Sequence, residues 1–321
     1  MAQQYARTVI NNYRMAISIG YLYQIVGTIF NGCSTDQHGG AIHLNHVGIN
    51  CTIFHCSFVS CYGIGSSSHG GAIAVEKSNN IRLSHSCFIS CKSYRCPGYI
   101  IWGHKGYGFQ VISTHFNMSS EYHPDISGSG SCLYSFEKLI YSNNNVSHST
   151  ANSIASGITF GAEVTSLCGR FFTFVDCSGN GMIGNAVNTP NIKNTLELCN
   201  FINCNALNGY GMVHMSWPNS ILFHRVVFSK CGFQHILQGT SSGSIEFQEC
   251  HFDSINSGAS FSYATTINCD FIGGYPVDHV VLDTLSCHTA SYQPDEPFTF
   301  LLPFMLTNRI PFFVMHLSSI F

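Results

Sequence analysis

The chain contains nearly the same phrase twice, with starts 31 residues apart. The segment HGGAIHLNHVGINCTIFHCSFVSC runs from His38 to Cys61, and HGGAIAVEKSNNIRLSHSCFISC runs from His69 to Cys91. One phenylalanine of the phrase recurs at steps of 19 to 30 residues, with Val146 in its fifth place, and we call these positions the anchors. The aromatic anchors are Phe30, Phe58, Phe88, Phe116, Phe174, Phe201, Phe228, Phe252 and Phe271. A nearly constant period of this length predicts a repeat architecture.

Further columns accompany the anchors at fixed offsets. Cysteines recur three residues after an anchor, and small polar or thiol side chains recur two residues before it. An offset of two is the side-chain period of a β-strand. The apolar runs are short and broken by SSSHGG, KSNN and SGSGS, which argues against a helical solenoid. We therefore predict an all-β chain, a right-handed single-stranded parallel β-helix of about ten coils with the anchors stacked inside.

The regularity of the repeat sets the expected boundaries. We predict a β-helix over residues 1–275, with a first coil near 15–33 and less regular coils after residue 230. Residues 276–296 are expected to form a C-terminal cap. Prolines break the apolar tail, 297–321, into runs too short for a membrane-spanning helix, so we expect it to be disordered or membrane-associated. The first thirty residues fit a coil better than a signal peptide, so membrane association is expected only through the tail or a segment missing from this chain.

Composition excludes several classes of function. Only 9% of the residues are charged, the formal net charge is −3, and Lys and Arg do not cluster. Nucleic-acid grooves and anionic membrane surfaces both need clustered positive charge, so no nucleic-acid partner is expected. The polar surface must consist mainly of Ser, Thr and Asn. Such surfaces are common on secreted proteins, which favours an extracellular or cell-surface location.

Sixteen cysteines raise the question of metal binding. Histidines and cysteines crowd together between His38 and Cys61, but their spacing follows the repeat rather than paired metal-ligand motifs, so neither a metal nor another cofactor is predicted. The cysteines that follow anchors are either disulfides between neighbouring coils or buried thiols, and the sequence leaves both open. They are Cys33, Cys61, Cys91, Cys177, Cys204 and Cys231.

Three triplets match the N-glycosylation pattern. They begin at Asn50, Asn117 and Asn145. Asn50 and Asn145 each lie one residue from an inward column, so strand alternation is expected to turn them outward, where a glycan could be carried. Chance occurrence in a chain rich in Asn and Ser is the alternative.

A family resemblance rests on GGAI at 39–42 and 70–73 together with the F-x-x-C anchors. The pair resembles the repeat of polymorphic outer-membrane proteins, whose pattern is GGAI with F-x-x-N. Versions with Cys look like those of predicted β-helical, adhesin-like surface proteins of parasitic protists. The resemblance covers about residues 25–275 with decreasing clarity. It implies a right-handed β-helix displayed at a cell surface, although this chain lacks the run of alternating strands that would form an outer-membrane barrel.

Two functions follow as hypotheses. The first is a non-catalytic secreted or cell-surface module for adhesion, with glycans or host and partner surface proteins as ligands. The alternative is a polysaccharide lyase or glycoside hydrolase, because some β-helices have these activities. Such enzymes need carboxylates that converge on one groove. The sparse acids here fall in different columns, so we expect no enzyme and nominate no catalytic residue.

Overall fold

The computed structural model describes most of residues 2–271. Residues left undescribed in this span are 7, 67, 94–98, 104–105, 113–114, 118–130, 136–138, 143, 152–157, 161–166, 180–182, 186–192, 207–210, 216–219, 234, 240–243 and 254–263. The chain divides into two compact units, 1–289 and 290–321. The second unit, the expected cap at 276–296 and the expected tail at 297–321 lie outside the described residues. The described residues contain no helix that is long and apolar enough to cross a membrane.

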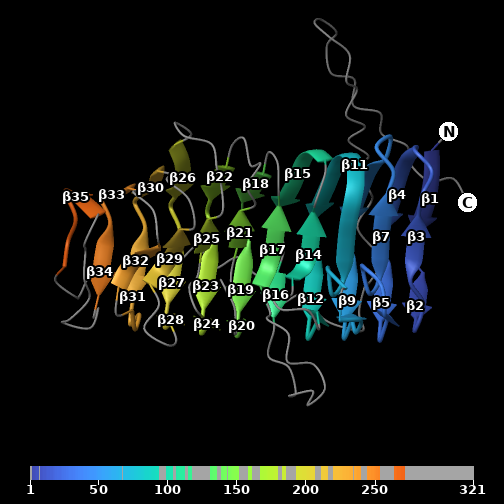
Figure 1. Cartoon of the computed structure of the whole chain (residues 1–321), viewed down its shortest axis with the longest axis horizontal. Coiled ribbons are helices and arrows are strands. Elements are labelled where there is room, and N and C mark those ends of the chain that lie inside the picture. The colour runs from blue at the N-terminus through green and yellow to red at the C-terminus, as the bar shows by residue number, and fades with distance from the viewer. Residues whose placement is uncertain are drawn as a thin grey trace, which may run out of the picture. The chain divides into compact units, whose positions relative to one another are not determined.

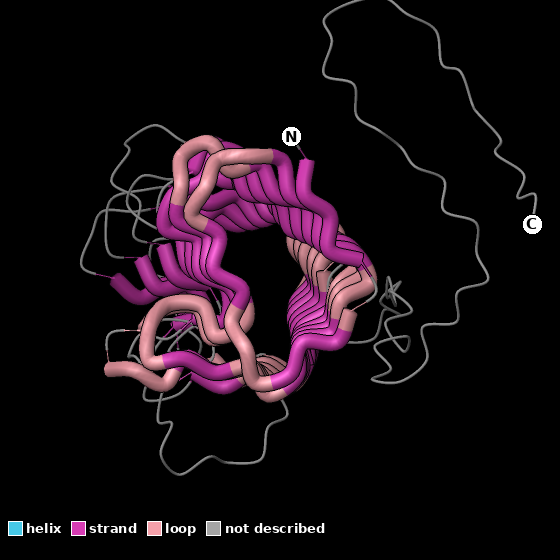
Figure 2. The backbone as a smooth tube through the Cα atoms, turned by 90° about the vertical axis from the view of Figure 1, so that its right-hand side faces the viewer, coloured by secondary structure: helices cyan, strands magenta, loops and turns pink. Residues whose placement is uncertain are grey.

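The first unit is an all-β solenoid of stacked parallel strands, as predicted (Figures 1 and 2). Its anchor sheet has ten strands, one from each coil. They are β2 (Val9–Asn11), β5 (Ile29–Asn31), β9 (Ser57–Val59), β12 (Cys87–Ile89), β16 (His115–Asn117), β19 (Asn145–Ser147), β23 (Thr173–Val175), β27 (Asn200–Ile202), β31 (Val227–Ser229) and β34 (His251–Asp253). The hand of the winding stays a prediction.

Two further sheets close each coil. The strands of the pre-anchor sheet come just before the anchor strands in the chain, and those of the GGAI sheet include the strands that follow the GGAI glycines. The long strand β11 (Ile73–Ser84) belongs to both sheets. The pre-anchor sheet also contains β1 (Ala2–Ala6), β4 (Leu22–Val26), β8 (Asn50–Phe54), β15 (Gly106–Ile112), β18 (Leu139–Ser142), β22 (Leu167–Arg170), β26 (Lys193–Glu197), β30 (Ser220–His224), β33 (Ser244–Gln248) and β35 (Ala264–Ile267). The GGAI sheet also contains β3 (Met15–Ile17), β7 (Ile42–Asn45), β14 (Tyr99–Gly103), β17 (Ser131–Ser135), β21 (Ile158–Phe160), β25 (Ile183–Asn185), β29 (Gly211–Met215) and β32 (His235–Gly239). Two-residue strands follow six of the anchor strands and pair with one another in two small sheets. They are β6 (Ser34–Thr35), β10 (Tyr62–Gly63), β13 (Lys92–Ser93), β20 (Thr150–Ala151), β24 (Ser178–Gly179) and β28 (Asn205–Ala206).

The anchors form a column of stacked rings inside the solenoid. Phe58 lies in register with Phe30 and Phe88, and its ring centroid is 4.9 Å and 4.5 Å from theirs, with nearly parallel planes. This separation follows the strand spacing of a sheet, about 4.8 Å. Fully buried anchors with described side chains are Phe30, Phe58, Phe88, Val146, Phe174, Phe201, Phe228 and Phe252. Phe116 pairs in register with Phe88, but its side chain is outside the described set.

Both ends of the column differ from expectation. At the N-terminus, Ile10 pairs with Phe30, so strands begin at Ala2, one coil before the first coil expected near 15–33. At the C-terminus, Phe271 stacks on Phe252 with centroids 5.0 Å apart, yet it is 51% exposed and its neighbour Asp270 joins the sheet only by an isolated bridge. Phe271 therefore continues the stacked ladder, as expected, but half of its surface is exposed because no described coil covers its outer side. The ten strands of the sheet run from Ile10 to Phe252.

The GGAI phrase makes a tight corner. Gly39 and Gly70 both have a φ of 71°, in the left-handed region that favours glycine. A Cβ on Gly40 would lie 2.1 Å from the carbonyl oxygen of Gly71, so the backbones of successive coils touch here. The Ala and Ile that follow the glycines are fully buried. The phrase recurs because the corner and the inward strand after it have the same requirements in both coils.

Candidate functional site

Ionisable side chains, rare in this chain, gather at the GGAI corner. We call Arg14, His38, His43, His69 and Glu76 the corner cluster. The histidines that precede the two GGAI phrases, His38 and His69, stack with ring centroids 5.4 Å apart. The Nδ1 atom of His38 accepts a hydrogen bond of 2.9 Å from the backbone N–H of His69. Arg14 donates to the carbonyl oxygen of His38 at 2.9 Å and to the side chain of Gln37 at 2.8 Å. The corner cluster is therefore held together by contacts between successive coils.

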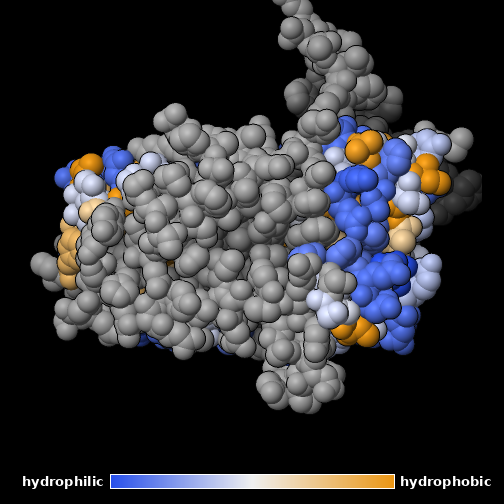
Figure 3. Space-filling view, in the orientation of Figure 1, coloured by the Kyte–Doolittle hydropathy of each residue, from blue (hydrophilic) through white to orange (hydrophobic). Residues whose placement is uncertain are grey.

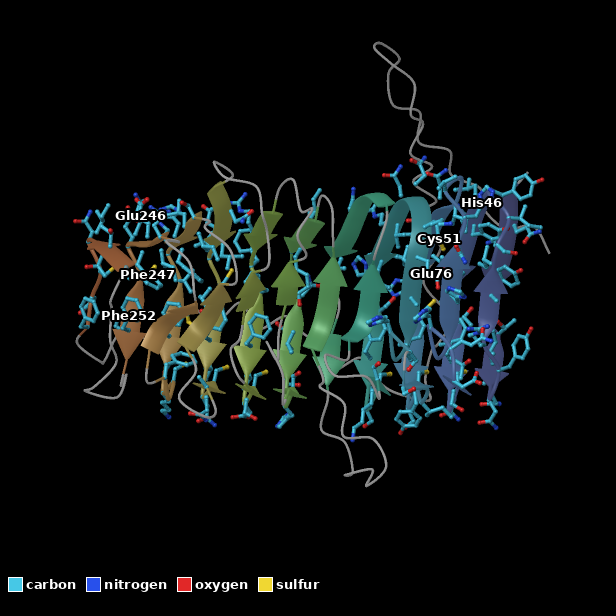
Figure 4. All side chains as sticks on the ribbon, in the orientation of Figure 1. His46, Cys51, Glu76, Glu246, Phe247 and Phe252 are labelled. Carbon is cyan, nitrogen blue, oxygen red and sulfur yellow. The ribbon has the colours of Figure 1, made fainter. Side chains whose placement is uncertain are left out.

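A β-bulge brings a carboxylate to these histidines. Along β11 and β7 the register shifts between Val75 and Lys77, leaving Glu76 without a direct partner. Bulges redirect side chains and are common beside functional sites. The Oε1 atom of Glu76 lies 3.2 Å from Nε2 of His43 and 3.6 Å from Nε2 of His38. Glu76 is labelled on β11 in Figure 4, and the described residues around it form a mainly hydrophilic surface (Figure 3).

Burial lowers the proton affinity of one member of the corner cluster, His43. Desolvation lowers the pKa of His43, and the neighbouring carboxylate of Glu76 opposes this effect only in part. A largely neutral imidazole beside a carboxylate can accept or donate a proton and can hydrogen-bond a polar ligand. Within the described parts of the chain, no group of three or more His, Cys, Asp or Glu side chains could hold a metal ion.

A second set of charges forms a row across four coils of the pre-anchor sheet. Arg170, Glu197 and His224 end successive strands in register, with Nε of Arg170 2.8 Å from Glu197 and Nδ1 of His224 3.4 Å from it. Glu249 continues the row, 3.9 Å from His224 and 2.7 Å from Nε of Arg225. The hydrogen bond from Arg225 lowers the pKa of Glu249. A general acid needs the opposite shift, so Glu249 is suited to surface ion pairing rather than proton donation.

The cysteines that follow anchors are buried thiols, which decides the alternative left open by the sequence. Each thiol donates a hydrogen bond to the carbonyl oxygen of the anchor one coil earlier. These bonds are Cys33 to Ile10, 3.4 Å; Cys61 to Phe30, 3.6 Å; Cys91 to Phe58, 3.3 Å; Cys177 to Val146, 3.7 Å; Cys204 to Phe174, 3.6 Å; and Cys231 to Phe201, 3.3 Å. The cysteines therefore satisfy backbone carbonyls at a corner, which is a structural role.

The same need explains the small polar residues two positions before the anchors. There the Sγ atom of Cys56 donates to the carbonyl of Ile25 at 3.4 Å, and Nδ2 of Asn144 donates to that of Val111 at 2.9 Å. Burial raises the pKa of Cys56 to about 12, whereas a hydrogen bond with the Cys61 thiol lowers that of Cys33 to about 7. Cys87, which lies outside both columns, is disulfide-bonded.

The candidate glycosylation sites have different surroundings. Asn50 is half-buried beside inward Cys51, and its Oδ1 accepts hydrogen bonds from Asn79 at 3.0 Å and Asn80 at 3.3 Å. Asn145 is half-buried beside Val146. Asn117 lies in β16, and its side chain is outside the described set. Glycan attachment stays a prediction at all three.

Comparison with known proteins gives little information on function. No protein-family model matches the chain, and no curated protein matches it. A solved structure, the crystal structure of Dettilon tailspike protein (gp208), is similar at 11% sequence identity with a TM-score of 0.23. The similarity covers 84% of this chain and 61% of that one. A likeness this weak carries no argument about the activity or ligands of this chain.

Proposed function

We propose that the chain is a non-catalytic binding module, secreted or displayed at a cell surface, that engages glycans or partner proteins along the outer faces of its solenoid. The observation that carries the proposal is the arrangement of its outward side chains. Parallel register repeats them in columns about 4.8 Å apart. On three successive coils of the pre-anchor sheet, Gln24, Thr52 and Arg82 form such a column. Regular rows of this kind suit an extended ligand.

The ionic groups also favour binding over catalysis. In the row across the pre-anchor sheet, Glu197 and Glu249 are each ion-paired with an arginine. Glycoside hydrolysis needs one carboxyl group kept protonated near neutral pH, together with a second carboxylate. The arginine beside Glu249 works against that state because it stabilises the ionised form and lowers the pKa of this carboxyl group.

Location and family belong to the same proposal. A disulfide at Cys87 is typical of an oxidising compartment, as is the neutral polar surface. The GGAI and F-x-x-C pattern supports kinship with adhesin-like repeats.

The test is binding of the purified full chain to a glycan array and to cultured cells. We expect saturable binding that is lost on heat denaturation. Folded protein that retains no glycan and no cell surface would refute the proposal. Salt titration shows how much of the binding is electrostatic, because screening weakens contacts between exposed charges.

One observation favours a second candidate, the polysaccharide-processing enzyme. His43 and Glu76 form a close imidazole–carboxylate pair with His38 beside it, as acid–base sites often do. Polysaccharides incubated with the chain would then be shortened, and both His43→Gln and Glu76→Gln would abolish the products. Unchanged substrates would exclude this candidate for the polysaccharides tested.

A further inference from the structure

One arginine differs from the other arginines that the structure describes. Arg14 is held by hydrogen bonds, and Arg170 and Arg225 are ion-paired. Arg82 is exposed on the outer side of β11, and no described residue forms an ion pair or hydrogen bond with it. In a chain with so few charges, an exposed guanidinium that pairs with no described residue is available for an anionic ligand. Its planar fork fits a carboxylate.

An aromatic group lies beside this arginine. Arg82 is in register with Thr52 of β8, and Phe54 follows on the same outward face of that strand. The parallel strand spacing and a two-residue step along the strand place the two Cα atoms about 8 Å apart, within reach of long side chains. The ring of Phe54 is half-buried, and the rings of His55 and His85 stand against it at 65° and 68°, with centroids at 4.1 Å and 5.1 Å.

The surrounding groups are neutral hydrogen-bonding side chains. Thr52 and Gln24 lie in the same outward column as Arg82, and the amides of Asn79 and Asn80 meet at Asn50 one column away. An aromatic face, neutral donors and acceptors, and one cation together match a sugar ring that carries a carboxylate. The apolar C–H face of a pyranose packs on an aromatic ring, while its carboxylate needs a positive partner.

We propose that Phe54 and Arg82 form a binding site for a carboxylated pyranose, a uronic acid or a sialic acid, with the ring on Phe54 and the carboxylate on Arg82. The inference deepens the proposed function and rests on it, because it locates one glycan subsite on the pre-anchor sheet. The sheet continues on either side of the two residues through β4 and β15.

The test is calorimetric titration of the full chain with three probes: a hyaluronan hexasaccharide, its carboxyl-reduced form and 3′-sialyllactose. We expect the hyaluronan probe or sialyllactose to bind and the reduced form to bind at least about tenfold more weakly, as loss of a charge-assisted hydrogen bond predicts. Arg82→Gln should weaken binding of the acidic probe by a similar factor, and Phe54→Ala by about threefold to tenfold. Arg170→Gln, which removes an arginine elsewhere on the same sheet, should leave the affinity unchanged.

The outcomes separate the two proposals. Equal binding of the acidic and reduced probes, or full affinity in both Arg82→Gln and Phe54→Ala, overturns this site while glycan binding stands. Failure of the folded chain to bind any glycan overturns the site together with the glycan arm of the proposed function. Binding of an acidic peptide in place of the sugars also overturns the site. Circular dichroism of each variant verifies that the fold is retained.

Discussion

Replacing Phe58 by alanine tests the stacked interior. The ring is fully buried between those of Phe30 and Phe88, at 4.9 Å and 4.5 Å. Alanine removes the ring and leaves a space that in-register strands cannot easily close. Loss of apolar burial together with the cavity costs about 3–5 kcal/mol. The two ring contacts account for about 0.5–1.5 kcal/mol each within that total.

Phe271→Ala is the matched control. Phe271 continues the same column and stacks on Phe252, but it is 51% exposed. We expect the free energy of unfolding to fall by about 1 kcal/mol or less. Urea unfolding followed by circular dichroism measures both variants. Equal losses, or a loss below about 1 kcal/mol for Phe58→Ala, would contradict the stacked column.

Three further predictions concern polar groups. Asn194 is fully buried, and neither polar atom of its side chain hydrogen-bonds a described residue, so Asn194→Leu should raise the free energy of unfolding by about 1–3 kcal/mol. Asn144→Leu should lower it, because Nδ2 of Asn144 donates to the carbonyl of Val111. Urea unfolding measures both, and a loss of stability in Asn194→Leu would refute the reasoning. Cys61→Ser should retain the carbonyl hydrogen bonds and cost less than Cys61→Val; the reverse order of melting temperatures would show that packing, not donation, selects Cys. Burial lowers the folded-state pKa of His43, so stability should fall as pH drops below about 6.5 toward that pKa; His43→Gln should flatten this decline in melting temperature, and an unchanged slope would exclude His43 as its source.

The period of the sequence was enough to predict the solenoid and its interior. Phenylalanine at a nearly fixed spacing marks an equivalent position in successive coils, and the described rings between Phe30 and Phe252 are fully buried there, which confirms it. Ile10 escaped notice because it is not aromatic and precedes Phe30 by only 20 residues. Strand pairing tolerates a non-aromatic anchor, as Val146 also shows, and Ile10 pairs with Phe30 despite the short step.

The corner cluster could not be read from spacing. Lys77 pairs with Asn45 and Asn80 pairs with Asn50, so three residue steps on one coil match five on the other. The segment after the Glu76 bulge is two residues shorter than its equivalent in the preceding coil, so the extra residue at the bulge cannot be seen from the overall spacing. Acids assigned to separate columns by counting can still meet histidines of the preceding coil. The role of the cysteines that follow anchors was also undecided in the sequence, because disulfides between coils and buried thiols are both compatible with the same spacing.

The central claim is that this solenoid binds its ligand without transforming it. The most direct test is mass spectrometry of the glycan that the full chain retains best, after prolonged incubation with the purified protein. Our account predicts that the glycan is recovered at its original mass. Shorter or unsaturated products that disappear in the Glu76→Gln variant would contradict the claim and make the corner cluster an active site.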